Sequence, residues 1–191
     1  MENPYAQPPP APANPYAPPQ AQIATPTGEG QFNFYTVGPL KFALLALTTF
    51  GIFVLYWFYK NWDVIRQREN EAIWPFWRAV FTGLWTFSMG GRFHAYAAQR
   101  GFSLEFPYVP IGIAFLVANI AARADGPLAF LSYVGFLIVI PFDFAARRLN
   151  GGGQLAEPTY GSFSALNVVW IIVGGILLLF ALLGIFIGDE F

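Results

Sequence analysis

Four ionisable residues lie within or beside long apolar stretches of this chain, and they are the first candidates for chemistry: Arg92, His94, Asp143 and Arg147. An ionisable side chain at membrane depth is costly and is therefore often functional. Asp143 and Arg147 are one helical turn apart, so they can pair on one helix face. These residues could line a polar path for an ion or a headgroup, or Asp143 and Arg147 could be a self-neutralised pair at an interface.

The composition excludes several other kinds of functional site. His94 is the only histidine, so a metal site built from several histidines is excluded. The chain has no cysteine, which excludes disulfides, thiolate metal sites and a thiol nucleophile. Ser88-Met89-Gly90 superficially resembles part of a serine hydrolase site but has no supporting motif. The sequence therefore predicts no catalytic, cofactor-binding or metal-binding residue, and no enzyme activity.

Five apolar stretches must position these residues, at 42–59, 79–91, 107–122, 128–146 and 165–188. The first and last are long enough to cross a bilayer, which takes about 20 apolar residues. The stretch at 79–91 is broken by glycine, serine and threonine, so residues 79–98 could span or lie in the interface. Pro141 is expected to kink the fourth stretch. The predicted fold is all-α, a polytopic helical membrane protein with four or five hydrophobic helices.

Charged residues are sparse, and the membrane topology that they predict depends on the number of crossings. Only 11% of residues are charged, against about 25% in soluble domains. The net charge of -1 gives no basic field for nucleic acid. With five crossings the ten Lys and Arg divide evenly between the two sides, whereas with four crossings eight of them share one side. The positive-inside rule therefore favours four crossings.

An aromatic cluster surrounds the polar loop at 60–78. Amphipathic rings of this kind form belts at the level of lipid headgroups. We expect such an interface belt from six residues: Tyr56, Trp57, Tyr59, Trp62, Trp74 and Trp77.

The chain divides into two parts. Residues 1–35 are rich in proline and contain Asn-Pro-Tyr-Ala twice, beginning at Asn3 and Asn14. Such a segment cannot bury enough apolar surface to fold, so we expect a disordered tail, either a docking arm or a spacer. Residues 36–191 form the predicted helical transmembrane domain.

Three segments are similar to bacterial multi-pass inner-membrane proteins that are grouped as a domain of unknown function. They are LYWFYKNW at 55–62, PFWRAVF at 75–81, and FSALN at 163–167 leading into Gly174-Gly175. The resemblance covers most of 36–188. It implies a location in the bacterial cytoplasmic membrane and supplies no activity.

These observations predict a small integral membrane protein that acts without catalysis, as an accessory or scaffold subunit. Its tail and aromatic loop would contact partners, which we expect to be the lipid bilayer and either other membrane proteins or a second copy of the chain. No nucleic acid and no cofactor are expected. The alternative is a transporter or channel component with a polar path near Arg92, Asp143 and Arg147.

Overall fold

A computed structural model describes residues 33–121 and 134–187, and these ranges are helical without a strand. The elements are α1 (Pro39–Thr48), α2 (Ile52–Glu69), α3 (Pro75–Val80), α4 (Thr82–Gln99), α5 (Tyr108–Ala121), the 3-10 helix η2 (Gly135–Val139), α7 (Ile140–Asn150) and α8 (Ala165–Ile187). The predicted all-α class is confirmed. Most of the predicted tail and the first residues of the stretch at 128–146 lie outside the described residues.

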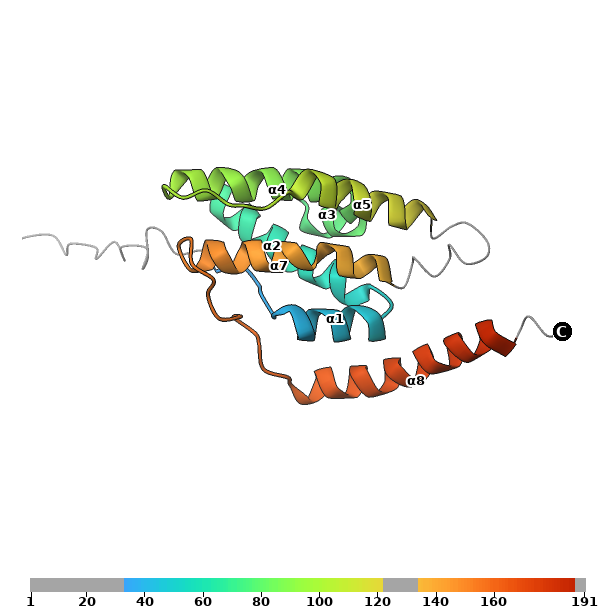
Figure 1. Ribbon diagram of the computed structural model, residues 1–191. Coiled ribbons are helices and arrows are strands. Elements are labelled where there is room, and N and C mark those ends of the chain that lie inside the picture. The colour runs from blue at the N-terminus through green and yellow to red at the C-terminus, as the bar shows by residue number, and fades with distance from the viewer. Residues whose placement is uncertain (1–32, 122–133, 188–191) are drawn as a thin grey trace, which may run out of the picture.

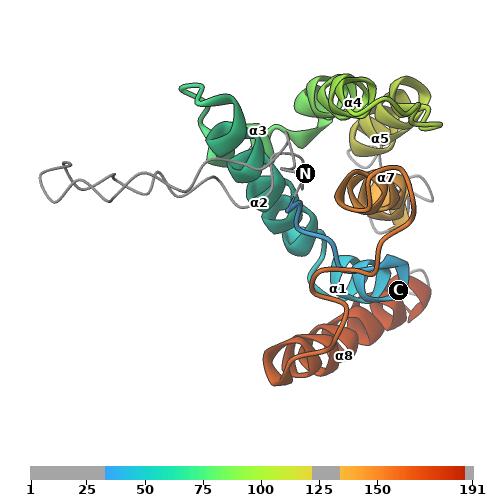
Figure 2. The same cartoon turned by 90° about the vertical axis from the view of Figure 1, so that its left-hand side faces the viewer.

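Helices α1, α4, α5, α7 and α8 run roughly along one common axis, and α2 runs obliquely to it (Figure 1). Seen down that axis, α5, α7, α1 and α8 follow one another in a column, with α4 beside α5 and with α2 and α3 along one flank (Figure 2). The helix contacts agree, because α1 packs on α2, α7 and α8, while α4 packs on α5 and α7. Helix α8 therefore lies at the outer edge of the bundle.

The first predicted span is not one helix. The stretch at 42–59 is divided between α1 and α2, which run in opposite directions (Figure 1). Between them Gly51 has a φ of 83°, a left-handed conformation that glycine adopts without steric cost. A Cβ at Gly51 would also lie 2.1 Å from the ring of Phe136. The prediction of a single crossing at 42–59 is thus wrong, because a glycine turn packed under a phenylalanine reverses the chain.

The second stretch behaves in the opposite way, since its polar and glycine residues do not end the helix. Helix α4 continues without interruption through Gly90 and Gly91 to Gln99, so Arg92 and His94 lie on a regular helix. Gly90 lies against the ring of Tyr108, and a Cβ there would be 2.4 Å from that ring. Small residues at this position let α4 and α5 approach closely.

Pro141 occupies a different place from the one expected. It lies in the first turn of α7, where a missing N–H breaks no helical hydrogen bond. The 3-10 helix η2 leads directly into α7, so the change from 3-10 to α geometry falls just before the proline. A kink within an α-helix is therefore not what this proline produces.

None of the helices in the described ranges combines the length and the apolar composition that a membrane crossing requires. Apart from the stretch at 42–59, the predicted crossings stay predictions.

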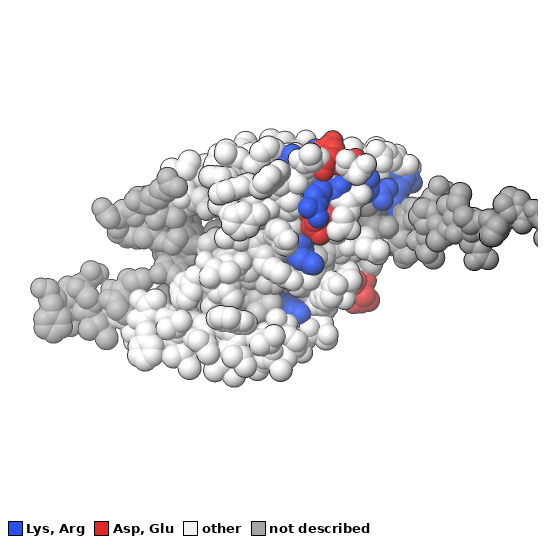
Figure 3. All heavy atoms as spheres, turned by 180° about the vertical axis from the view of Figure 1, so that it is seen from behind, with Lys and Arg blue, Asp and Glu red and all other residues white. Residues whose placement is uncertain are grey.

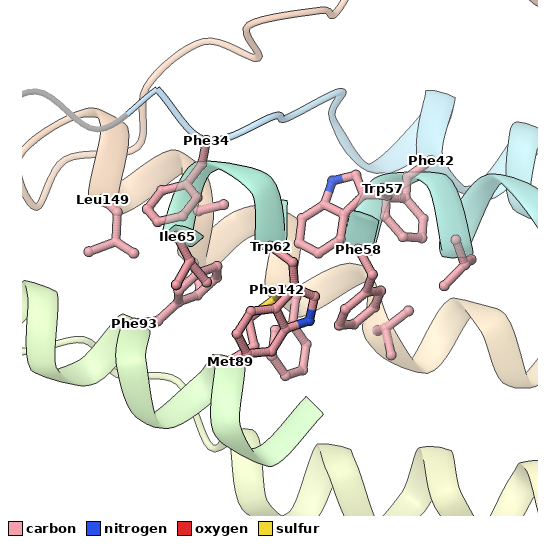
Figure 4. Packing of buried hydrophobic residues seen from close by; sticks show 14 of the residues in the cluster. Phe34, Phe42, Trp57, Phe58, Trp62, Ile65, Met89, Phe93, Phe142 and Leu149 are labelled. Atoms are coloured by element: carbon pink, nitrogen blue, oxygen red, sulfur yellow. The ribbon is translucent and has the colours of Figure 1, made fainter. Parts of the chain in front are cut away.

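The core lies where α2, α4 and α7 meet the segment before α1 (Figure 4). Trp57, Trp62 and Phe142 are fully buried there. The Phe142 ring lies 4.7 Å from the Phe106 ring and 5.8 Å from the Phe58 ring, measured between centroids. Phe34 is also fully buried, so the end of the predicted tail belongs to the folded part of the chain.

Replacing Phe142 by alanine should lower the free energy of unfolding by about 3–5 kcal/mol, because the cavity cannot close among rigid aromatic neighbours. Denaturant unfolding followed by circular dichroism measures the change. The matched control is Phe76→Ala on the exposed side of α3, for which we expect under about 1 kcal/mol. Equal losses in the two variants would contradict this description of the core.

Candidate functional site

Asp143 holds the segment that leads into α1. Its side chain is fully buried in α7. One carboxylate oxygen accepts hydrogen bonds from the backbone N–H of Val37 at 3.0 Å and from the Trp57 indole N–H at 3.1 Å. The other accepts from the backbone N–H of Gly38 at 3.1 Å. A single carboxylate thus joins α7, α2 and the segment that leads into α1.

Two asparagines hold the same segment through reciprocal hydrogen bonds. The Asn61 amide accepts from the Tyr35 N–H at 2.9 Å and donates to the Tyr35 carbonyl at 3.0 Å. The Asn150 amide does the same with Phe34, at 2.9 and 3.0 Å. Each amide replaces the partner that a neighbouring strand would offer to an extended backbone. Residues 34–38 are therefore fixed between α2 and α7 by side chains.

Arg147 and Lys41 hold the connection to α8. The Arg147 Nε donates to the Ala156 carbonyl at 2.7 Å. The Lys41 Nζ donates to the carbonyls of Tyr160 at 2.8 Å and Ser162 at 2.7 Å. Asp143 and Arg147, which were expected to pair, therefore bond to different parts of the chain. Lys41 is almost completely buried.

Arg92 and His94 connect other elements. The Arg92 guanidinium forms ion pairs with Glu69 and, at 3.2 Å, with Glu71, which ties α4 to the end of α2. The His94 Nε2 is 2.8 Å from the Phe106 carbonyl, and its ring stacks on that of Phe106. The four predicted polar residues are thus not brought together in one place.

The six aromatic residues predicted as an interface belt divide into two groups. Trp57 and Trp62 differ from the prediction, because both are fully buried in the core. The Arg78 guanidinium lies 4.4 Å from the Trp62 ring and 4.4 Å from the Trp85 ring. The other four rings are exposed, on Tyr56, Tyr59, Trp74 and Trp77. Helical spacing alone does not separate the groups, since Trp62 is three residues after Tyr59 and therefore lies on a neighbouring part of the same face of α2.

A cleft of about 670 Å³ lies between α8 and the α1–α2 pair. We call it the α1–α8 cleft. Tyr35, Tyr56, Ser164 and Asn167 line part of it, and apolar residues such as Leu45 and Val173 line much of the rest. No local sequence pattern indicates this cleft, because its walls come from segments more than a hundred residues apart. Its volume lies in the range of about 300–1,000 Å³ that is typical of small-molecule sites.

No group of His, Asp and Glu side chains that could hold a metal ion occurs among the residues that the structure describes. Neither a protein-family model, nor a curated protein, nor a solved structure matches this chain. The resemblance to bacterial inner-membrane proteins therefore stays a prediction, and the geometry of the site alone must support a function.

Replacing Asp143 by alanine should lower the free energy of unfolding by about 3 kcal/mol or more, because three buried donors lose their acceptor together. Thermal or denaturant unfolding measures the loss. The matched control is Asp63→Ala, since Asp63 is partly exposed and pairs only with neighbours on its own helix; it should cost under about 1 kcal/mol. A stable Asp143→Ala protein would remove the structural role assigned to this carboxylate.

Tyr35 makes stability sensitive to alkaline pH. Burial, assisted by Tyr56, Tyr160 and Asp143, raises the pKa of Tyr35 from 10.0 to about 12. Because the folded state disfavours the phenolate, this contribution to stability is complete below pH 10 and is lost as the pH rises towards 12.

The thermal unfolding midpoint should therefore fall less steeply in Tyr35→Phe than in the wild type between about pH 10 and pH 12. Tyr59→Phe, at an exposed tyrosine, is the control and should follow the wild type. Parallel curves for Tyr35→Phe and the wild type would show that this tyrosine does not control alkaline unfolding.

Proposed function

We propose that this chain is a small helical membrane protein that acts without catalysis, as a scaffold or accessory subunit in the bacterial cytoplasmic membrane. The observation that carries the proposal is the uncovered apolar surface of α8. Among its described side chains, those from 44 to 71% exposed include Leu166, Val168, Val169, Trp170, Ile172, Val173, Ile176, Leu177, Leu179, Phe180 and Leu183. Soluble monomers rarely expose a continuous apolar patch of more than a few hundred Å².

Among the described residues, packing within the chain covers one side of α8, the side that faces α1. Gly174 lies directly on α1, and a Cβ there would be 1.8 Å from the Thr48 carbonyl oxygen. The close approach that this glycine allows is thus used within the chain. Gly175 has open space beside it, and it belongs to the side that we propose is covered by lipid.

The distribution of charge supports the same proposal. On the face shown in Figure 3, charged side chains gather in one half of the molecule and the other half is white. The last turns of α2 and α7 are basic, with Arg66 and Arg68 on α2 and Arg147 and Arg148 on α7. An apolar half inserted into lipid and a charged end at its surface would satisfy both kinds of side chain.

An aromatic patch on α3 gives the proposed subunit a surface for partners. Trp74, Phe76, Trp77 and Phe81 are all exposed, and the Trp77 ring stacks on that of Phe81 with centroids 6.2 Å apart. Clustered aromatic side chains are typical of interaction surfaces and of membrane interfaces. The contribution of the proline-rich tail lies outside the described residues.

The contacts of the ionisable residues favour the scaffold over the transporter. A polar path for a solute needs polar side chains that lie along one route and can exchange hydrogen-bond partners with that solute. The carboxylate oxygens of Asp143 instead accept hydrogen bonds from backbone N–H groups of the chain itself, and Arg147 donates to a loop carbonyl. We therefore propose structural roles for Asp143, Arg147 and Arg92.

Cysteine labelling tests the proposal, because the chain has no cysteine of its own. The ends of α2 and α7 lie at the same end of the bundle (Figure 1). We expect Gln67→Cys and Gln154→Cys to react with a membrane-impermeant thiol reagent from the same side of the membrane. Ile52→Cys, at the other end of α2, should react only after detergent is added.

Reaction of Gln67→Cys and Gln154→Cys from opposite membrane sides would contradict the proposed insertion. So would release of the protein from membranes by alkaline carbonate. Full reactivity of Ile52→Cys in intact membranes would place the apolar end of the bundle in water.

A further inference from the structure

The α1–α8 cleft has hydrogen-bonding groups gathered toward one end. Tyr35 and Ser164 precede α1 and α8, and Asn167 lies in the first turn of α8. Both helices begin at the charged end of the bundle and run towards its apolar end (Figure 1). The mouth of the cleft, formed by Tyr35, Ser164 and Asn167, is therefore close to the charged end.

The far part of the cleft presents hydrocarbon in spite of two threonines in its wall. The Thr48 hydroxyl donates to the Leu44 carbonyl at 2.7 Å, and the Thr49 hydroxyl donates to the Leu45 carbonyl at 2.6 Å. The Thr49 hydroxyl also accepts from the Phe53 N–H. Because these hydroxyls are used within the helices, an occupant meets mainly apolar side chains there, including Phe50, Ile52 and Leu177.

One positive charge lies close to the mouth, outside the cleft lining. The side chains that line the cleft include no acidic and no basic residue. The nearby Lys41 ammonium is fixed to the carbonyls of Tyr160 and Ser162, just before the first turn of α8. The N-terminus of α8 adds a partial positive charge there. Ser164 and Asn167 cap this end, because the Asn167 Oδ1 accepts from the Ser164 N–H at 3.1 Å and the Ser164 Oγ accepts from the Asn167 N–H at 3.3 Å. A negatively charged headgroup therefore complements the mouth, while a hydrocarbon chain complements the rest.

We propose that the α1–α8 cleft binds one phospholipid of the surrounding bilayer, with an acyl chain between α8 and the α1–α2 pair and the phosphate at the Tyr35–Ser164–Asn167 mouth. This inference rests on the proposed insertion of the chain into a membrane. The orientation follows from that insertion, because a lipid beside the bundle has its headgroup at the charged end and its tails towards the apolar end. Burial of the acyl chain supplies the affinity.

The test uses the full chain in nanodiscs that contain a phosphatidylglycerol with a photoactivatable diazirine on one acyl chain. Val173→Trp fills the cleft, since Val173 lines its wall on α8. Ile172→Trp is the matched control, because Ile172 is the next residue, is similarly exposed and does not line the cleft. Ile52→Trp fills the cleft from the α2 wall and is the second variant. Circular dichroism checks the fold of each variant.

We expect photolabelling of α1 and α8 peptides to saturate at one lipid per chain in the wild type and in Ile172→Trp. It should fall about tenfold in Val173→Trp and Ile52→Trp. A diacylglycerol with the same diazirine chain should compete less well than phosphatidylglycerol, since it lacks the phosphate.

Labelling that is equal in all four proteins would mean that only the lipids surrounding the bundle are seen, and it would overturn the proposal. Labelling that is replaced by crosslinks between two copies of the chain would assign the cleft to a dimer and would also overturn it. Retention in carbonate-washed membranes is measured in parallel. A retained protein without cleft labelling refutes the lipid site alone, whereas a released protein refutes the proposed function as well.

Discussion

The buried carboxylate of Asp143 is the interaction on which the arrangement of the helices depends. Two of its three donors are backbone N–H groups just before α1, and the third is the Trp57 indole on α2. Such donors would be costly to bury without an acceptor. Because Asp143 belongs to α7, this one side chain fixes where α1 begins relative to α7. The asparagines at 61 and 150 extend this control to Tyr35 and Phe34.

That arrangement also produces the cleft. Residues 34–38 bring Tyr35 beside Tyr160, with ring centroids 4.8 Å apart, and Lys41 then holds the loop that enters α8. Helix α8 consequently lies on α1 through Gly174, while most of its large side chains stay uncovered. The polar contacts at the charged end thus determine which apolar surface remains available, and the scaffold and lipid-site proposals share this physical basis.

Several features of the fold could be predicted from the sequence because they are local. Apolar stretches separated by glycine and proline indicate helices, and helices are found at 82–99, 108–121 and 165–187, close to three of the predicted stretches. The same stretches do not say whether an apolar residue faces protein or lipid. Trp57 and Tyr56 are neighbours in an aromatic run, yet one is fully buried and the other is exposed.

By itself, the sequence determined the all-helical class, the scarcity of charge and the absence of any cysteine or multiple-histidine site, since each follows from composition or from short-range periodicity. Only the tertiary structure decided that residues 42–59 reverse direction, that Asp143 and Arg147 act separately, and that α8 leaves a cleft against α1. The physical reason is the length of chain between the partners: Asp143 bonds to residues 105 and 106 positions away, and Lys41 to carbonyls 119 and 121 positions away. Contacts over such separations depend on how the helices pack together, which no local pattern encodes.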